Sequence, residues 1–492
     1  MRAIRRAVAS AGIALSVLVL PTGLSGAIVD VLLPSTSTGV PNGKLALRLY
    51  TPQAGQARYP QGAPVLIWGS GGTHEGLMNN QLPAGSRDLI VINFLFPGGG
   101  DPNFHGSDGT YDYRGPASIQ ALRDVILYAA GQMTDDLGRT IDDVSPVTVL
   151  HDNIGLVGSS NGGNIVVAVA AMYGADLAGY LRYIIQWESP VSSQIATRDF
   201  GRILFDPSLP TQGDFVNPRY GAYGTLSLPV DFSDLAYDAG GPLYEVFHDG
   251  TGDGHYTTIV HPQTSLPTPD LNLDGVLDAN EDFPLDAYPT ATKDVYSRAV
   301  TQAFQDNNVF AGPWPSHIAT VAEANAYWDI REAVRLYDEA APNMPGLEAM
   351  VLAGVRDHVQ ATPDKPHVRQ AFEGWLGQNV WVQVNPDAAY LVLADPNLTG
   401  RTDLPDNAPN TPPADWADVA AYAVPADIDK GVYQLAAVWQ MADRVQGVEL
   451  DGSDPPANCC CFASAAPMIV GLLALAGGVV WKRTSISEED RT

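Results

Sequence analysis

Residues 154–162 have the sequence IGLVGSSNG, and this stretch decides the fold. Its first four residues are apolar and partly β-branched, which predicts a short buried strand. The next five match the pattern G-x-S-x-G with Ser160 at the centre, and an apolar segment at residues 165–172 follows as a buried helix or strand. A serine on a tight turn between a strand and a helix is exposed at the top of a sheet, so Ser160 is a candidate nucleophile.

The rest of the chain repeats this rhythm of apolar runs and helical segments. Short apolar runs predict further strands at residues 65–68, 89–92, 182–187, 350–353 and 380–384. Apolar residues from Ile119 to Ala129 recur at helical spacing. Strands alternating with helices are typical of a mostly parallel sheet that is covered by helices. The predicted fold class is therefore α/β.

The rhythm stops between about residues 196 and 316, where Gly, Pro, Asp and Tyr dominate and apolar runs are few. This segment is predicted to be an insertion above the sheet that acts as a lid, because the loops of such folds carry their sites. It divides the core into residues 28–195 and 317–400. Residues 401–457 form a C-terminal region that begins with a linker rich in Pro, Asn and Asp and continues with helical segments up to about residue 446.

With this context the chain resembles the α/β-hydrolase superfamily over roughly residues 28–395, without the insertion. The Gly-rich turn that follows the strand at 65–68 stands where the superfamily has its oxyanion loop. The resemblance implies that backbone N–H groups of Asn161 and of Gly71 or Gly72 hold the developing oxyanion. It also implies a serine hydrolase that cleaves an ester or peptide bond through an acyl-enzyme, with a small-molecule or peptide acyl substrate.

A serine nucleophile needs a base, which is normally a histidine that a carboxylate orients. The predicted strand at 350–353 is followed by Gly-Val-Arg-Asp, which resembles the superfamily's turn that bears the acid. Asp357 is therefore the favoured carboxylate. Glu188, which follows the strand ending at Trp187, is the alternative.

The histidine departs from the superfamily pattern, which expects it after the last strand, because His367 is the last histidine of the sequence. The candidates are His367, His358 and His74. His367 is favoured because it lies ten residues beyond Asp357 on a loop long enough to fold back over the sheet, whereas His358 adjoins Asp357 and is expected to point away from it. The departure leaves a second hypothesis open: a calcium-stabilised surface binding protein on an inactive hydrolase scaffold.

Residues 270–281, DLNLDGVLDANE, match the 12-residue EF-hand calcium loop at every diagnostic position. The predicted ligands are the side chains of Asp270, Asn272, Asp274, Asp278 and Glu281 and the backbone carbonyl of Val276. Prolines flank the loop, so a full pair of helices is not expected. Calcium is therefore predicted as a structural cofactor that ties together an insertion with little apolar core. The acidic stretch at 249–254 lacks a terminal glutamate and is predicted to be a turn.

The charge of the chain narrows the range of partners. The 492 residues include 55 acidic and 27 basic ones, for a net charge of -28. Such a surface repels phosphate backbones, so nucleic acid is not an expected partner and divalent cations are. With 45% hydrophobic and 17% charged residues, the composition is that of a globular protein.

Both ends of the sequence carry targeting signals. Residues 1–27 combine early arginines, an apolar run and small residues, which is typical of a secretory signal peptide. Residues 462–481 carry no charge and are followed by Lys482 and Arg483, which predicts a transmembrane helix with the body of the protein outside the cell. The expected location is extracytoplasmic, anchored to the membrane or cell surface; a buried core helix is the alternative for this stretch.

The three cysteines are consecutive, at residues 459–461, directly before this apolar stretch. Together with the apolar helix and the basic residues, they make the segment 458–483 resemble the C-terminal sorting tags of some bacterial surface proteins. That resemblance implies a sorting or processing enzyme that acts on the segment 458–492, by cleavage or by lipid modification at the cysteines. A plain single-span anchor is the alternative.

Overall fold

The structure is a computed structural model that describes residues 26–450. Within this range residues 83, 102–104, 196, 204–213, 222–229, 242–243, 258, 261–266, 269, 273, 275 and 361 are not described. The chain consists of two units, Met1–Leu450 and Asp451–Thr492, and the second lies outside the described residues. The predicted transmembrane helix and nearly all of the predicted signal peptide also lie outside them. No helix in the described part of the chain is long and apolar enough to span a membrane.

The central sheet has eight strands in the order β1-β2-β4-β3-β5-β6-β16-β17. Their bounds are β1 Ile28–Pro34, β2 Lys44–Tyr50, β3 Ala63–Gly69, β4 Ile90–Phe94, β5 Val149–Ser159, β6 Leu181–Trp187, β16 Glu348–Leu352 and β17 Trp381–Val384. β2 pairs antiparallel with both its neighbours, and every pair from β4 to β17 is parallel. The predicted fold class, an α/β-hydrolase-type mostly parallel sheet, is confirmed. Parallel strands bring the loops after β3, β5, β6 and β16 to one edge.

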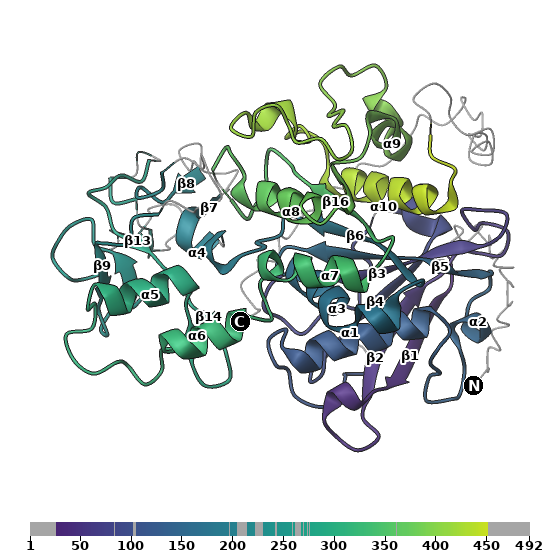
Figure 1. Cartoon of the computed structure of the whole chain (residues 1–492), viewed down its shortest axis with the longest axis horizontal. Coiled ribbons are helices and arrows are strands. Elements are labelled where there is room, and N and C mark those ends of the chain that lie inside the picture. Colours follow the sequence, from purple (N-terminus) through teal and green to yellow (C-terminus); the bar gives the residue numbers. More distant parts are fainter. Residues whose placement is uncertain are drawn as a thin grey trace, which may run out of the picture. The chain divides into compact units, whose positions relative to one another are not determined.

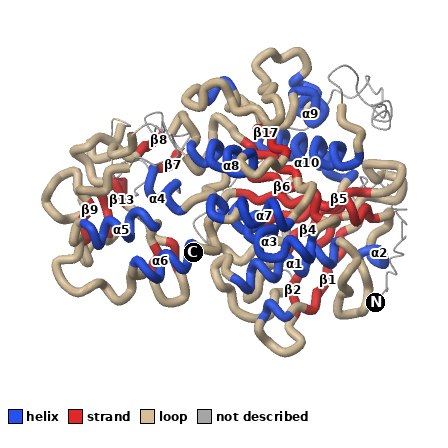
Figure 2. Tube along the Cα trace, viewed as in Figure 1, coloured by secondary structure: helices blue, strands red, loops and turns tan. Residues whose placement is uncertain are grey.

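Helices cover both faces of this sheet. One face carries α1 (Pro116–Ala129), α3 (Gly162–Leu177), α7 (Tyr337–Asn343) and α8 (Pro366–Leu376), and the other carries α9 (Ala388–Ala394) and α10 (Lys430–Gln446). Figure 2 shows the red strands between these two groups of helices. Successive strand residues point to opposite faces, so Leu156 joins the first apolar cluster and Val157 the second. Burial on both faces explains why the strands were recognisable as continuous apolar runs.

The segment between β6 and β16 contains short strands and helices (Figure 1, teal to green). The strands are β7 Gly201–Ile203, β8 Asp214–Val216, β9 Leu235–Tyr237, β10 Val246–His248, β11 Ile259–Val260, β12 Pro267–Thr268, β13 Phe283–Pro284, β14 Tyr288–Pro289 and β15 Asp294–Val295. Besides α7, which covers the sheet, the helices are α4 Thr197–Phe200, α5 Arg298–Asp306 and α6 Val321–Trp328. α6 lies beyond the predicted end of the insertion at residue 316, yet it packs against α5.

The prediction that the insertion has little apolar core was wrong. Val246, Phe283 and Phe304 are buried in a cluster that joins β10, β13 and α5. A second, smaller cluster contains Val295 and Trp328. These residues are spread singly along the sequence, so they formed no apolar run that a search for strands and helices detects.

Candidate active site

Ser160 occupies the turn between β5 and α3, as the G-x-S-x-G pattern predicts. Its φ of 48° lies in the left-handed region, which non-glycine residues rarely adopt. The turn is held from two sides, because the Ser160 N–H donates to the Trp187 carbonyl at 2.8 Å and the Ser160 carbonyl accepts from the Gly163 N–H at 2.9 Å. Such a strained conformation persists only where its surroundings hold it, and such sites are often functional.

The two glycines of the pattern are required by close backbone approach. A Cβ at Gly158 would lie 2.6 Å from the Cα of Gly163, and a Cβ at Gly162 would collide with the Gly69 carbonyl oxygen at the end of β3. Both separations are shorter than non-bonded atoms adopt in proteins. The glycines therefore let the start of α3 pack onto β3 and β5, which places Ser160 at the carboxyl edge of the sheet.

The Gly-rich turn after β3 lies directly against Ser160. A Cβ on Gly71 would be 2.8 Å from the Cβ of Ser160. Side chains hold both peptide units of this turn: Arg114 Nη2 donates to the Gly71 carbonyl at 2.9 Å, and Asn161 Nδ2 donates to the Gly72 carbonyl at 3.1 Å. Among the described residues, the backbone N–H groups of Gly71, Gly72 and Asn161 have no hydrogen-bond partner. The choice between Gly71 and Gly72 as the second oxyanion donor therefore stays a prediction.

The histidine at Ser160 is His358. It follows β16, and its Nε2 lies 3.3 Å from Ser160 Oγ. Its Nδ1 contacts Oε2 of Glu188. With the proton on Nδ1 directed at this carboxylate, Nε2 is the acceptor that faces the hydroxyl. The side chain of His358 is 49% exposed, so the reacting edge of the ring is open to an incoming molecule.

Glu188 is the carboxylate that completes this series of contacts. It follows β6, has a φ of 45° and is buried. Two residues of α10 contact it as well: Lys430 Nζ lies 2.8 Å from Oε2, and the Tyr433 hydroxyl donates to Oε1 at 3.3 Å. Burial, followed by the charge of Glu188, raises the pKa of Tyr433 well above its usual value, which keeps this hydroxyl a donor.

The structure places the two favoured residues, Asp357 and His367, elsewhere. Asp357 Oδ2 lies 2.6 Å from Nε2 of His367, and Oδ1 accepts from the Val359 N–H at 2.7 Å. Asp357 and His367 are both buried. His367 stands at the start of α8 and therefore points into the core beneath the loop that carries His358. His358 was expected to point away from Asp357, but an oxygen of Asp357 and a nitrogen of His358 lie within 4.8 Å of each other, and it is His358 that contacts Ser160.

The Asp357 carboxylate nevertheless lies close to the nucleophile's partners. One oxygen or nitrogen each of Glu188, Asp357 and His358 lie within 4.8 Å of one another. Burial would raise the pKa of Asp357, but His367, and less strongly Lys365 and His358, hold it well below its usual value. Asp357 is thus ionised and adds negative charge beneath His358. Carboxylates and a histidine at this separation are also a conceivable metal set, but here each is engaged with protein partners.

His74, the third histidine candidate, lies over the oxyanion loop and not at Ser160. Its ring approaches Gly72, and its Nδ1 accepts from the Gly76 N–H at 3.3 Å. Burial and the nearby charge of Arg114 lower the pKa of His74. Lys430, Tyr433 and Arg114 were not among the predicted site residues, since no local pattern distinguishes them in the sequence.

The predicted calcium loop has side-chain oxygens turned onto its own backbone. Asn272 Oδ1 accepts from the Asp274 N–H at 2.9 Å, Asp274 Oδ1 from the Val276 N–H at 2.8 Å, and Glu281 Oε2 from the Asp278 N–H at 3.1 Å. Short strands β12 and β13 flank the loop in place of helices, in agreement with the flanking prolines. Gly275, the predicted sharp-turn residue, lies outside the described residues.

Two carboxylates of this loop are buried, Asp270 and Glu281 at the first and twelfth positions. Burial, and then the negative charges of Asp270 and Asp278, raise the pKa of Glu281. No three of the loop's described carboxylates have oxygens within 4.8 Å of one another, however. The residue types are those that calcium prefers, and calcium binding at this loop stays a prediction.

The acidic stretch at 249–254 forms a turn, as predicted. Both oxygens of Asp249 accept from backbone N–H groups, Oδ1 from Gly252 at 2.7 Å and Oδ2 from Gly254 at 3.0 Å. The buried Asp282 accepts from Thr251 and Thr257 in the same way. The carboxylates of this turn are occupied by the protein itself.

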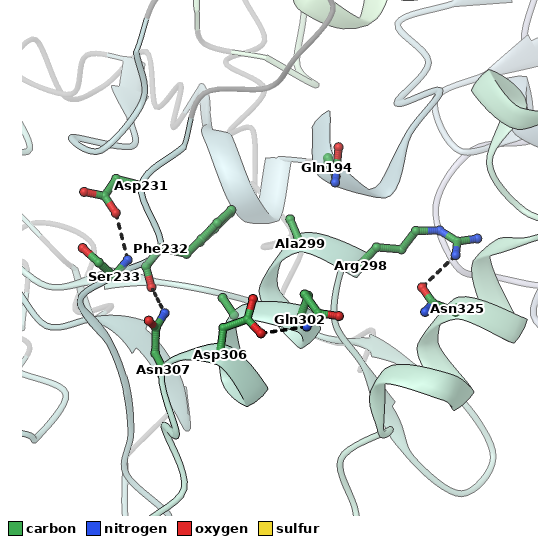
Figure 3. Close-up of a pocket in the computed structure, with 11 residues that line it drawn as sticks. Gln194, Asp231, Phe232, Ser233, Arg298, Ala299, Gln302, Asp306, Asn307 and Asn325 are labelled. Atoms are coloured by element: carbon green, nitrogen blue, oxygen red, sulfur yellow. Dashed lines mark hydrogen bonds between the residues drawn. The ribbon is translucent and has the colours of Figure 1, made fainter.

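A cavity of about 560 Å³ lies on the insertion and includes none of these residues (Figure 3). Several of its polar side chains are paired with one another, as the dashed lines of Figure 3 show for Arg298 with Asn325 and for Gln302 with Asp306. Arg298 also contacts Glu332 and Asp329. We therefore place the candidate site at Ser160 and not in this cavity.

No protein-family model matches the chain, and no curated protein matches it significantly. Solved structures similar to it include a hyperthermophilic esterase from the archaeon Pyrobaculum calidifontis, with 16% identity, a TM-score of 0.22 and coverage of 34% of this chain and 45% of the esterase. A thermophilic carboxylesterase from a metagenomic library has 17% identity, a TM-score of 0.22 and coverage of 34% and 48%. In these two comparisons the chain spans about half the length of the esterase. Carboxyl esterase 2 from the fungus Tuber melanosporum has 11% identity, a TM-score of 0.32 and coverage of 74% and 77%.

Proposed function

We propose that this protein is a serine hydrolase that cleaves an ester or peptide bond through an acyl-enzyme. Ser160 is the nucleophile, His358 the base and Glu188 the orienting acid. One observation carries the proposal: His358 contacts Ser160 Oγ through Nε2, at 3.3 Å, and Glu188 through Nδ1. A distance of 3.3 Å is compatible with catalysis, because such contacts tighten when substrate binds.

In the acylation step, Ser160 Oγ bonds to the carbonyl carbon of the substrate while Nε2 of His358 takes the hydroxyl proton. Glu188 stabilises the imidazolium that forms. The N–H groups of Asn161 and of Gly71 or Gly72 donate to the oxyanion, and one such donor is worth about 3 kcal/mol in the transition state. His358 then gives the proton to the leaving group as its bond to the carbonyl carbon breaks.

Deacylation repeats the sequence with water. Nε2 of His358 takes a proton from a water molecule as its oxygen bonds to the acyl carbon, and the bond to Ser160 Oγ breaks. The proton returns to Ser160 Oγ, and the products are a carboxylic acid and the regenerated enzyme. The exposed edge of His358 gives water access to the acyl carbon.

Lys430 and Tyr433 hold Glu188 in place for this role. A buried carboxylate is costly unless hydrogen bonds satisfy its oxygens. Lys430 shares Oε2 with His358, and Tyr433 occupies Oε1. The last helix of the fold thus orients the acid, although the superfamily resemblance predicted a histidine from that end of the chain.

The remaining parts of the proposal concern calcium and location. The loop from Asp270 to Glu281 binds calcium and stabilises the insertion; the burial of Asp270 and Glu281 and the sequence match support this. The protein is exported and anchored by the apolar segment at 462–481, which the signal-like first 27 residues and the basic residues after the segment support. A sorting or processing enzyme acts on the cysteine motif at 459–461.

The rival hypothesis, a binding protein on an inactive scaffold, rested on the lack of a histidine after the last strand. A histidine does reach Ser160, however, because His358 contacts it from the loop after β16. No contact in the described residues specifically favours a binding protein on an inactive scaffold, so we propose only the serine-hydrolase function.

Burst kinetics test the proposal. With p-nitrophenyl acetate, the purified protein is expected to release one p-nitrophenol per chain in a rapid phase, followed by slower turnover that is limited by deacylation. Ser160→Ala is expected to show neither phase. Hydrolysis by Ser160→Ala at the wild-type rate would contradict the proposal, as would complete inactivity of the correctly folded wild type toward activated esters.

A further inference from the structure

A buried guanidinium lies beside the nucleophile and takes no part in the steps above. Arg114 precedes α1, and it and its neighbour Tyr113 have φ values of 65° and 53°. Two consecutive non-glycine residues in the left-handed region are unusual, and backbone strain of this kind occurs where the surrounding structure requires a side chain in one place. The strained turn directs Arg114 to the oxyanion loop, where Nη2 donates to the Gly71 carbonyl.

The donors of Arg114 are only partly used. Nε donates to the Tyr111 hydroxyl at 3.1 Å, and the guanidinium lies 4.8 Å from the centre of the Phe96 ring. The side chain is 4% exposed, and Nη1 is buried with no hydrogen-bond partner among the described residues. Since Nη1 carries two N–H groups, a buried charged group here has two donors to offer.

Arg114 also lacks a counter-charge, although the chain has 55 acidic residues. No carboxylate forms a salt bridge with it within the described residues, in contrast to Arg298 in the cavity of Figure 3. Nearby acidic side chains are engaged elsewhere or exposed: Asp112 accepts from the Ala117 N–H at the start of α1, and Glu75 lies in solvent.

A second arginine, Arg331, behaves in the same way. Its three nitrogens donate to the backbone carbonyls of Tyr113, Tyr327 and Asp112, at 2.8 to 2.9 Å, and no carboxylate in the described part of the chain forms a salt bridge with it. Two of these carbonyls belong to the strained turn. Arg331 thus fixes the turn that carries Arg114 and brings a second positive charge, which the nearby Asp112 carboxylate partly offsets.

Both arginines line one small pocket with Asn161, the residue after the nucleophile. Tyr288, Tyr327 and Trp328 also line it, together with Asn164, Ile165 and Ile330. The pocket has a volume of about 10 Å³, which is room for about one water-sized group. Two guanidiniums that form no salt bridge among the described residues thus meet beside the residue that follows Ser160.

We propose that Arg114, assisted by Arg331, binds a carboxylate of the substrate, so that the enzyme prefers esters that carry a negative charge near the scissile bond. The proposal rests on the proposed function and names the substrate class of the same site. Guanidinium groups recognise carboxylates through paired N–H donors, and a buried unpaired charge is stabilised when such a partner arrives.

Matched pairs of esters test this preference and locate the carboxylate. The acyl-side pair is p-nitrophenyl hemisuccinate and p-nitrophenyl pentanoate. The leaving-side pair is 4-acetoxybenzoate and its methyl ester. For one pair, the wild type is expected to give kcat/KM values at least about tenfold higher for the anionic member, the effect of one charged hydrogen bond. Equal values, or lower values for the anionic member in both pairs, would overturn the proposal.

Arg114→Met should then reduce the anionic-to-neutral ratio by about 10- to 100-fold, and Arg114→Lys should restore part of it. Because Arg114 also holds Gly71, both members of each pair should become slower in Arg114→Met, and the ratio is the informative quantity. The control Arg335→Gln removes an exposed charge near Asp329 and should leave the ratio unchanged. An equal loss for both members in Arg114→Met would mean that Arg114 serves only the oxyanion loop.

One measurement needs no variant. Free succinate should inhibit hydrolysis of the neutral ester by the wild type competitively, and more strongly than its diamide. Absence of that difference would overturn the carboxylate site even if Arg114→Met failed to fold. The underlying function is judged separately: ester hydrolysis that survives in Ser160→Ala refutes the hydrolase proposal, whereas a Ser160-dependent enzyme without charge preference refutes the carboxylate site alone.

Discussion

Replacing Glu188 by glutamine removes one charge and keeps the shape of the side chain. Because Lys430 Nζ donates to Oε2, an amide at this position is expected to keep its oxygen toward Lys430 and His358 and to turn its NH₂ toward Tyr433. His358 then keeps its proton on Nδ1 and its acceptor toward Ser160. What disappears is the attraction between the carboxylate and the imidazolium that forms during the reaction.

The size of that loss follows from Coulomb's law. Two unit charges at about 4 Å interact by about 4 kcal/mol at an effective dielectric constant of 20. Removing this attraction lowers kcat by about 10³-fold, since about 1.4 kcal/mol corresponds to a factor of ten. KM should change by less than about threefold, because Glu188 is buried and does not contact substrate.

The matched control is Asp357→Asn, the same change in the carboxylate that the sequence favoured. Asp357 hydrogen-bonds His367 and the Val359 N–H and makes no hydrogen bond with His358, so kcat per folded molecule should fall less than in Glu188→Gln. Breaking this buried pair should cost about 3–5 kcal/mol of unfolding free energy. Steady-state kinetics with p-nitrophenyl acetate and urea unfolding of both variants check the pair. A larger kcat loss in Asp357→Asn than in Glu188→Gln would refute the assignment of the acid.

Further predictions concern the base, the buried pair, calcium and the last helix. His358→Ala should lower kcat by about 10³-fold or more, whereas His367→Ala should mainly lower the melting temperature; the opposite order in ester assays would identify His367 as the base. Because the pKa of Asp357 is lowered in the folded state, its stabilising contribution is present above about pH 4, the unfolded value, and is lost as pH falls further. The unfolding free energies of wild type and Asp357→Asn in urea should therefore converge as pH falls below about 4. A difference between them that does not change with pH would contradict this. Chelator should lower the melting temperature, because it removes about 2.7 kcal/mol of unfolding free energy if calcium stood at a hundredfold excess over Kd. Glu281→Gln should abolish this response. Since the Glu281 pKa is raised, calorimetry should also show weaker calcium binding at pH 5 than at pH 7. Lys430→Met should lower kcat about tenfold with little change in KM, and an unchanged kcat would show that Glu188 needs no support from α10.

The sequence predicted those parts of the protein whose signals are local. The nucleophile turn is encoded in five consecutive residues around Ser160, and each glycine has a steric requirement that any strand-turn-helix unit imposes. The strands of the parallel part of the sheet were recognisable because burial on both faces makes them continuously apolar. β1 and β2 were not predicted: β1 is only partly buried, and the apolar run of β2, although mostly buried, is interrupted by Arg48.

The acid and base were harder to predict from the sequence, because the choice of residues depends on where three loops meet in the fold. The expectation that His358 points away from Asp357 set aside the histidine that contacts Ser160, although the two side chains approach within 4.8 Å of each other. It also rested on the assumption that the acid follows β16. Glu188 lies 170 positions from His358 in the sequence, and the parallel pairing of β6 with β16 brings the two loops together.

Long-range partners such as Lys430 and Arg114 were beyond the reach of a pattern search. Lys430 meets Glu188 across 242 positions, and Arg114 meets Gly71 across 43. Each is one basic residue among 27. What distinguishes them is a tertiary contact and, for Arg114, burial without a counter-charge, and neither property leaves a local signature.

The central claim is that Ser160 is an activated nucleophile, and covalent labelling tests it most directly. The purified wild type should react with a fluorophosphonate to give one adduct per chain by intact mass spectrometry, and peptide mapping should place the adduct on Ser160. Ser160→Ala, shown to be folded by circular dichroism, should remain unlabelled. An adduct on Ser160→Ala, or a folded wild type that does not react, would contradict the account.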